Sequence, residues 1–342
     1  GVNGVFAPVM AFSDAFARFG GITRRAALCG GVGGIVTLAA AQAQAQAETQ
    51  AVRDAAVEIP FVLDPDGRAV VDVMLNGQGP FRLIVDTGAT ATVVSPLVAQ
   101  TLGLTATHIA PVHGITGVTE APIARLVSLD LGGQRFAGIE AALLGGRVMG
   151  SADGLLGMGA WRNHRMTLDF AAGAFRVGAS AGDRARASLT RAEGALLHGT
   201  LLLTPARVGS VDAIALIDTG ATHTLMNPAM ALALPGADGV LGLRAEAPAA
   251  TVGSAQSAAP AVLSVVEVGN LRVRRLVAFQ APMAVFDLFA SPDEPALVLG
   301  MDVWRHALAL SVDYPRAELQ LRLDDETGAV RRGTGSRIPD DL

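Results

Sequence analysis

Two identical segments of the chain place the same chemical groups in the same order. They are Asp86-Thr87-Gly88-Ala89-Thr90 and Asp218-Thr219-Gly220-Ala221-Thr222, and they begin 132 residues apart. Each follows a short apolar run, over 81–85 and 214–217, that is typical of a buried strand. An aspartate at the end of such a strand costs free energy unless its carboxylate is satisfied. We therefore expect the two carboxyl groups to meet and share one proton, an arrangement that can activate a water molecule.

A second pair of matching segments shows that the repeat extends beyond these loops. In Asp153–Arg162 and Ala296–Arg305, Gly157 precedes Trp161 by four residues, as Gly300 precedes Trp304. Two matched pairs in the same order indicate an internal duplication. One D-T-G alone would favour a strand-ending turn in which the aspartate caps the following backbone. Two copies with matching downstream segments favour the catalytic interpretation.

Local patterns predict the elements that position the two aspartates. Apolar alternation predicts a strand over Ala69–Leu75, Asn76-Gly77 predicts a hairpin turn, and Phe81–Val85 predicts the strand that leads to Asp86. After each D-T-G, a cap residue followed by proline predicts a short helix, beginning after Ser95 in the first half and after Asn227 in the second.

Composition excludes several classes of protein. Of the 342 residues, 51% are hydrophobic and 17% charged, and the net charge is −5, so neither a disordered chain nor a nucleic-acid partner is expected. Arg24-Arg25, a weakly apolar stretch and the A-x-A sites of residues 43–47 resemble a twin-arginine export signal. The single cysteine, Cys29, lies inside this segment. We expect a bacterial protein exported to the periplasm or secreted, with no stable membrane insertion after cleavage of the signal.

The duplicated motifs resemble those of bacterial retropepsin-like aspartic proteases. D-T-G-A-T is similar to their active-site loop, and Leu155-Leu156-Gly157 and Val298-Leu299-Gly300 resemble the apolar segment beside that loop. The resemblance implies an all-β, bilobal, pepsin-like acid protease fold made of two retropepsin-like halves with short helices. We predict a signal over 1–47, an N-terminal lobe over 48–187, a C-terminal lobe over 188–323 and a polar tail over 324–342. Because both halves lie in one chain, we expect a monomer.

The resemblance also implies roles for individual residues. Asp86 and Asp218 would form the catalytic dyad, Thr87 and Thr219 would tie the two loops together, and Gly88 and Gly220 would allow close backbone approach. Ala89 and Ala221 stand where pepsins carry a hydroxyl residue. The sole tyrosine, Tyr314, falls in the last predicted strand and not in a flap. We predict the flap at His113-Gly114-Ile115-Thr116-Gly117, and an opposing loop at 253–257.

The function that these features imply is hydrolysis of peptide bonds in a polypeptide substrate, by an aspartic endopeptidase that needs no cofactor and no metal. One alternative is a catalytically inactive protein on the same fold that binds peptides or the cell envelope. Another is a serine hydrolase, because Gly178–Gly182 matches G-x-S-x-G around Ser180. That motif needs a strand before it and a packed helix after it, whereas here a charged stretch follows. The six histidines show no zinc-binding spacing.

Overall fold

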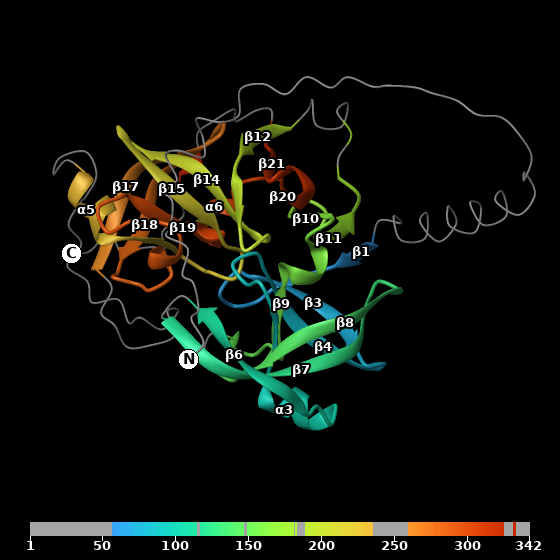
Figure 1. The fold of residues 1–342 in the computed structure, drawn as a ribbon. Coiled ribbons are helices and arrows are strands. Elements are labelled where there is room, and N and C mark those ends of the chain that lie inside the picture. The colour runs from blue at the N-terminus through green and yellow to red at the C-terminus, as the bar shows by residue number, and fades with distance from the viewer. Residues whose placement is uncertain are drawn as a thin grey trace, which may run out of the picture. The chain divides into compact units, whose positions relative to one another are not determined.

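The computed structural model describes residues 57–114, 117–146, 149–180, 182, 189–234, 259–324 and 331–332. All of them belong to one compact unit, Asp54–Leu342. Strands dominate this part of the chain, and its helices are short (Figure 1). The prediction of an all-β fold with short helices is confirmed. The predicted signal, the predicted loop at 253–257 and most of the predicted tail lie outside the described residues.

The first half of the chain forms an eight-stranded sheet in the order β2-β3-β4-β9-β5-β8-β7-β6. The strands are β2 (Val62–Leu63), β3 (Ala69–Leu75), β4 (Gln78–Asp86), β5 (Thr92–Val94), β6 (Ala106–Gly114), β7 (Gly117–Leu131), β8 (Gln134–Leu143) and β9 (Gly154–Gly157). The β3–β4 hairpin turns at Asn76-Gly77, as predicted. Both residues have positive φ, 51° and 75°, which this tight turn requires and which asparagine and glycine tolerate.

The second half repeats this arrangement, with strands in the order β13-β14-β15-β19-β16-β18-β17 and β22 beside β18. The strands are β13 (Ala195–Leu197), β14 (Leu201–Val208), β15 (Val211–Ile217), β16 (Thr224–Met226), β17 (Ala259–Val268), β18 (Leu271–Gln280), β19 (Ala296–Leu299) and β22 (Arg331–Arg332). In each half the strand that leads to an aspartate lies parallel to a later apolar strand, β4 beside β9 and β15 beside β19.

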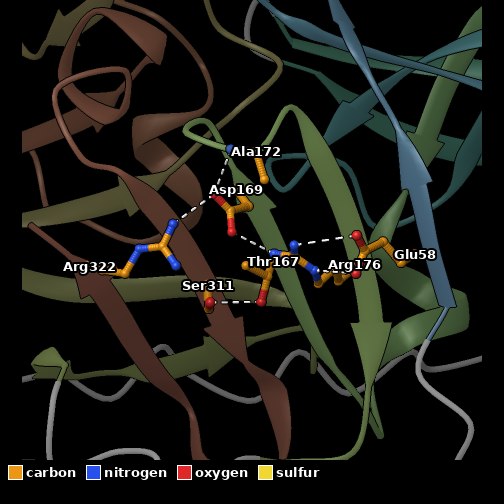
Figure 2. Close-up of polar contacts among 7 residues, drawn as sticks. All are labelled: Glu58, Thr167, Asp169, Ala172, Arg176, Ser311 and Arg322. Atoms are coloured by element: carbon orange, nitrogen blue, oxygen red, sulfur yellow. Dashed lines mark hydrogen bonds and ion pairs between the residues drawn. The ribbon is translucent and has the colours of Figure 1, made fainter.

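A third sheet takes strands from both halves, in the order β1-β11-β10-β20-β21-β12. These are β1 (Val57–Pro60), β10 (Arg165–Asp169), β11 (Ala174–Gly178), β12 (Thr190–Glu193), β20 (Ala309–Asp313) and β21 (Glu318–Arg322). Its central pair, β10 and β20, joins the halves in antiparallel register, with Thr167 opposite Ser311. Their hydroxyl oxygens lie 2.7 Å apart and form a buried hydrogen bond (Figure 2).

Charged side chains also connect the strands of this shared sheet (Figure 2). The buried carboxylate of Asp169 accepts hydrogen bonds from Arg176 Nη1 at 2.6 Å, Arg322 Nη2 at 2.8 Å and the Ala172 N–H at 3.0 Å. Arg176 Nε in turn donates to Glu58 Oε2 at 2.7 Å. Burial raises the pKa of Asp169, but the three donors outweigh it, and its pKa lies below the ordinary value. One carboxylate thus joins β10 and β11 to β21 of the other half, and Arg176 extends the connection to β1.

Short helices follow each D-T-G loop where the capping patterns predict them. Helix α3 (Pro96–Thr101) begins after Ser95, whose side chain accepts a hydrogen bond from the Val98 N–H at 3.3 Å. Helix α5 (Pro228–Ala233) begins after Asn227, whose Oδ1 accepts from the Met230 N–H at 2.9 Å. The other helices within the described residues are η2 (Met158–Trp161), η3 (Phe286–Leu288), α6 (Met301–Trp304) and η4 (Tyr314–Arg316).

The apolar core runs through both halves, and a buried tryptophan occupies the same place in each repeat. Trp161 ends η2 and Trp304 ends α6, and both side chains are fully buried. Trp304 Nε1 donates to the Leu299 carbonyl at 2.8 Å, at the end of β19. Trp161 packs edge to face on Phe136, with ring centroids 4.3 Å apart. These residues therefore fix the segments that lie beside the two D-T-G strands.

Candidate active site

The sheets of the two halves deliver Asp86 and Asp218 in the same way. Asp86 is the last residue of β4 and pairs with Gly157 at the end of β9. Asp218 follows β15, and its N–H donates to the Leu299 carbonyl at 3.1 Å. Each aspartate thus leaves a central strand that is buried between two neighbours, and its side chain is carried to the edge of the apolar core.

The structure brings the two carboxyl groups together. Asp86 is 8% exposed and Asp218 3% exposed, and their side chains are within hydrogen-bonding reach of each other. A Cβ placed on Gly88 would lie only 2.5–2.7 Å from the carboxyl atoms of Asp218. A Cβ on Gly220 would meet the Asp86 carboxyl just as closely. Glycine is therefore required in each loop, because the acid of the other half occupies the space a side chain would take.

Thr87 and Thr219 interlock the two loops through four buried hydrogen bonds. Thr87 Oγ1 donates to the Ile217 carbonyl at 2.8 Å and accepts from the Thr219 N–H at 3.0 Å. Thr219 Oγ1 donates to the Val85 carbonyl at 2.7 Å and accepts from the Thr87 N–H at 3.1 Å. Each hydroxyl thus satisfies one donor and one acceptor of the opposite strand end. This reciprocal contact holds the aspartates of the two halves at a fixed separation.

Backbone donors around the two acids are unequal. Asp86 Oδ1 accepts one N–H, from Gly88 at 2.9 Å, whereas Asp218 Oδ1 accepts two, from Gly220 at 2.8 Å and Ala221 at 3.1 Å. Burial raises the pKa of both acids, and the charge of Asp218 raises the pKa of Asp86 further, well above the ordinary value. The second N–H stabilises ionised Asp218. The raised pKa values of both acids favour one proton held by the pair, and the backbone donors around the two acids are unequal.

Arg68 is a buried cation near the pair that the sequence patterns did not reveal. It follows the Asp64–Gly67 turn between β2 and β3, and its side chain is only 4% exposed. It pairs with Asp64 at 2.8 Å and with Asp66 at 3.4 Å. Its charge lowers the pKa of both Asp86 and Asp218, opposing the effect of burial. An arginine that directly precedes the apolar strand Ala69–Leu75 was the only available signal.

Tyr314 lies in the shared sheet region, at the start of η4 directly after β20, and not in a flap. Its side chain is fully buried, and burial together with the charge of Asp86 raises the pKa of its phenol. Tyr314 therefore stays neutral. Within the described residues its hydroxyl has no hydrogen-bond partner.

The predicted flap falls on a long antiparallel hairpin. Strands β6 and β7 pair from Ala106 opposite Ala124 to Gly114 opposite Gly117. His113 and Gly114 thus end one strand, and Gly117 begins the other. Ile115 and Thr116, at the tip, lie outside the described residues. The backbone of the hairpin agrees with a flap, and its role remains a prediction.

The remaining candidates do not assemble into a site. Ser180 Oγ donates to the buried carboxylate of Asp313 at 2.8 Å and accepts from Arg316 Nε at 3.0 Å. These contacts tie the end of β11 to η4, and in the part of the chain that the structure describes the serine forms no hydrogen bond with a histidine. The same part holds no cluster of metal-ligating side chains. Nor does it hold a helix long and apolar enough to cross a membrane.

Comparison with known proteins gives the following similarities. The family model described as "Aspartyl protease" matches residues 71–160 and 204–303, one segment in each half and together more than half of the chain. A crystal structure of a retropepsin-like aspartic protease from Rickettsia conorii is 22% identical, with a TM-score of 0.27. That similarity covers 36% of this chain and 91% of the other. No curated protein sequence matches the chain.

Proposed function

Since this chain belongs to the aspartyl protease family, we propose that it is an aspartic endopeptidase that hydrolyses peptide bonds with Asp86 and Asp218 as its catalytic dyad. The observation that carries the proposal is the meeting of the two acids, each in the space left by the other loop's glycine. Interlocked threonines hold this geometry. Two buried carboxyl groups at hydrogen-bonding distance cannot both ionise near neutrality, so the pair keeps a proton.

The proposed mechanism uses the unequal environments of the two acids. Asp218, with two backbone donors, is the charged member and takes a proton from a water molecule bound across the pair. Asp86, whose pKa is raised further, donates a hydrogen bond to the carbonyl oxygen of the scissile peptide. The water oxygen attacks the carbonyl carbon and gives a tetrahedral intermediate. A proton then passes to the leaving nitrogen as the C–N bond breaks.

We propose that the polypeptide substrate binds in an extended conformation. The hairpin of β6 and β7 forms the edge of the first-half sheet, because β6 has one neighbour in the order of the described strands. An edge strand offers unpaired backbone groups to an extended peptide, which gives affinity that does not depend on sequence. Residues 113–117 would then close over the peptide.

The direct test replaces each acid by its amide. Asp86→Asn and Asp218→Asn should each abolish cleavage of a diverse peptide mixture while leaving the folded protein intact by circular dichroism. The matched control is Asp212→Asn, an aspartate on β15 whose side chain is 79% exposed, which should cleave like the wild type. Full activity in either dyad variant would exclude this mechanism. Binding of peptides by the wild type without any cleavage would support the inactive binding protein instead.

We also propose that the chain acts outside the cytoplasm of a bacterium, as a monomer. The support is the Arg24-Arg25 pair and the A-x-A sites that follow it. Replacing the pair by two lysines should retain the protein in the cytoplasm in a fractionation experiment. Light scattering of the exported protein should give the mass of one chain. Unchanged export of the variant, or a stable dimer, would contradict these two statements.

A further inference from the structure

The two D-T-G loops lose their symmetry at the sixth residue. They are identical over Asp86–Thr90 and Asp218–Thr222, and threonine follows again at 92 and 224. Between these matching residues the first loop has Ala91 and the second has His223. The repeat therefore carries a methyl group on the first loop and an imidazole at the equivalent position of the second loop.

The residues next to Ala91 and His223 also differ in size, and again the larger side chain lies in the second half. On β8 and β18, the strands next to the two loops, Ala142 pairs with Val93 and Phe279 pairs with Leu225. Phe279 thus occupies the place of Ala142. In the second half, this larger aromatic ring contacts His223, with centroids 5.2 Å apart. The imidazole is therefore supported by a neighbour that the first half lacks.

The segment behind each loop shows a third difference. The N–H of Gly159 donates to the Thr90 carbonyl at 2.9 Å, and the N–H of Asp302 donates to the Thr222 carbonyl at 3.2 Å. Gly159 and Asp302 are thus equivalent. The Asp302 carboxylate accepts two further hydrogen bonds from Thr224, the residue after His223, at 2.8 and 2.9 Å. This pair fixes the backbone that carries the imidazole, and the first half has no counterpart to it because Gly159 has no side chain.

Charged groups from both halves act on His223, which is exposed. Partial burial of the ring and the charge of Arg305, at the end of α6, lower the pKa of His223. The charge of Asp66, on the β2–β3 turn of the first half, raises it. Arg68 follows the same turn, pairs with Asp66 and acts on both dyad acids. The charges of one turn of the first half thus act on both acids and on His223, which follows Asp218 by five residues on the second D-T-G loop.

We propose that His223 determines specificity by binding an acidic side chain of the substrate on one side of the scissile bond only. This inference rests on the proposed peptidase function. With Asp66 paired to Arg68, protonated His223 carries a positive charge, to which the charge of Arg305 adds, and this suits a carboxylate. On the other side Ala91 offers only a small apolar contact. A peptide with one glutamate would therefore bind in a single direction.

The preference for glutamate should exist only within a limited pH range. His223 must be protonated, so the preference disappears as the pH rises above the lowered pKa of the imidazole. The substrate glutamate must be ionised, so the preference also disappears below about pH 4. A bound carboxylate raises the pKa of His223, which widens this range at its upper end.

The test uses pairs of peptides that differ in one residue, which is glutamate in one peptide and glutamine in the other. This residue is placed in turn at each of the four positions on either side of the cleaved bond. The wild type should give a Glu/Gln ratio of kcat/KM of about ten at pH 5 for one position, falling towards one at pH 8. His223→Ala and His223→Asn should give a ratio near one at both pH values while still cleaving the glutamine peptides. His198→Asn, a control at an exposed histidine on the turn before β14, should retain the wild-type ratio.

The outcomes separate this inference from the function on which it rests. If the wild type cleaves none of the peptides, the peptidase function itself fails. If the wild type cleaves them but shows no position with a pH-dependent ratio, or if His223→Ala keeps that ratio, the role of His223 is refuted and the peptidase function stands. Equal preferences at two positions, one on each side of the cleaved bond, would also refute the single direction of binding.

Discussion

Removing one hydroxyl from the interlock should measure how strongly the two D-T-G loops hold the halves together. Thr87→Val keeps the shape of the side chain and deletes both hydrogen bonds of Oγ1. The Ile217 carbonyl and the Thr219 N–H then lose their partner in a region where Thr87 and Thr219 are 1% and 0% exposed. A buried polar group left unsatisfied costs about 1–3 kcal/mol, so the variant, with two such groups, should lose about 2–6 kcal/mol of unfolding free energy.

The matched control is Thr87→Ser, which keeps the hydroxyl and loses one methyl group. This change should cost about 1 kcal/mol. In urea unfolding followed by tryptophan fluorescence, Thr87→Val should move the midpoint down by about 1 M, for a slope of about 3 kcal/mol per molar. Trp161 and Trp304 report on both halves because each is fully buried in its own repeat. Peptide cleavage should fall more than tenfold in the valine variant, because the two acids are no longer held in register.

The argument would be refuted by a valine variant that unfolds at the same urea concentration as the serine variant. That result would mean that water or a shifted backbone satisfies the two groups. A second check is the double variant Thr87→Val with Thr219→Val. Since the two hydroxyls belong to one network, the loss in the double variant should differ from the sum of the single losses.

Three other perturbations follow from the structure. Gly88→Ala should abolish cleavage in a peptide assay, because its Cβ would lie 2.5–2.7 Å from the Asp218 carboxyl atoms. The pKa of Asp169 is lowered in the folded state, so the ionised side chain stabilises the fold above about pH 4, and this stabilisation is lost as the pH falls through the folded pKa. In urea titrations at several pH values, Asp169→Asn should unfold more easily than the wild type at pH 7. Its unfolding free energy should then fall less than that of the wild type on going to acid pH. Burial raises the pKa of Asp302 to about 6, so the unfolding free energy of the wild type should fall as the pH rises from about 4 to about 6. Asp302→Asn should flatten this fall. If the unfolding free energies of the variant and the wild type change with pH in parallel, the argument is contradicted.

Local sequence patterns predicted the elements that carry the two acids. Asn76-Gly77 predicted the β3–β4 turn because only residues that tolerate positive φ suit it. Ser95 and Asn227 predicted the starts of α3 and α5 because each accepts a hydrogen bond from an N–H of the first turn. The duplication predicted that the halves would repeat each other, and the matching positions of β9 and β19 beside the D-T-G strands agree with it.

Contacts between residues far apart in the sequence were not predictable in this way. Arg68 is separated from Asp218 by 150 residues, and nothing in its local pattern indicates that its charge acts on the dyad. The bonds of Asp169 to Arg322, and of Arg176 to Glu58, depend on the register of strands in the shared sheet (Figure 2). Register across halves is set by the packed core and not by any single segment.

Joining both halves in one chain has a physical consequence for the dyad. Two identical chains related by a two-fold axis must surround their two acids with the same donors, so neither acid is favoured as the proton carrier. Here the second loop supplies an additional N–H, from Ala221, that the first loop does not supply to Asp86. The same loop carries His223 where the first has Ala91. Duplication within one chain allows each copy to change separately, so the interlocked threonines keep the acids together while the surrounding residues give them different environments.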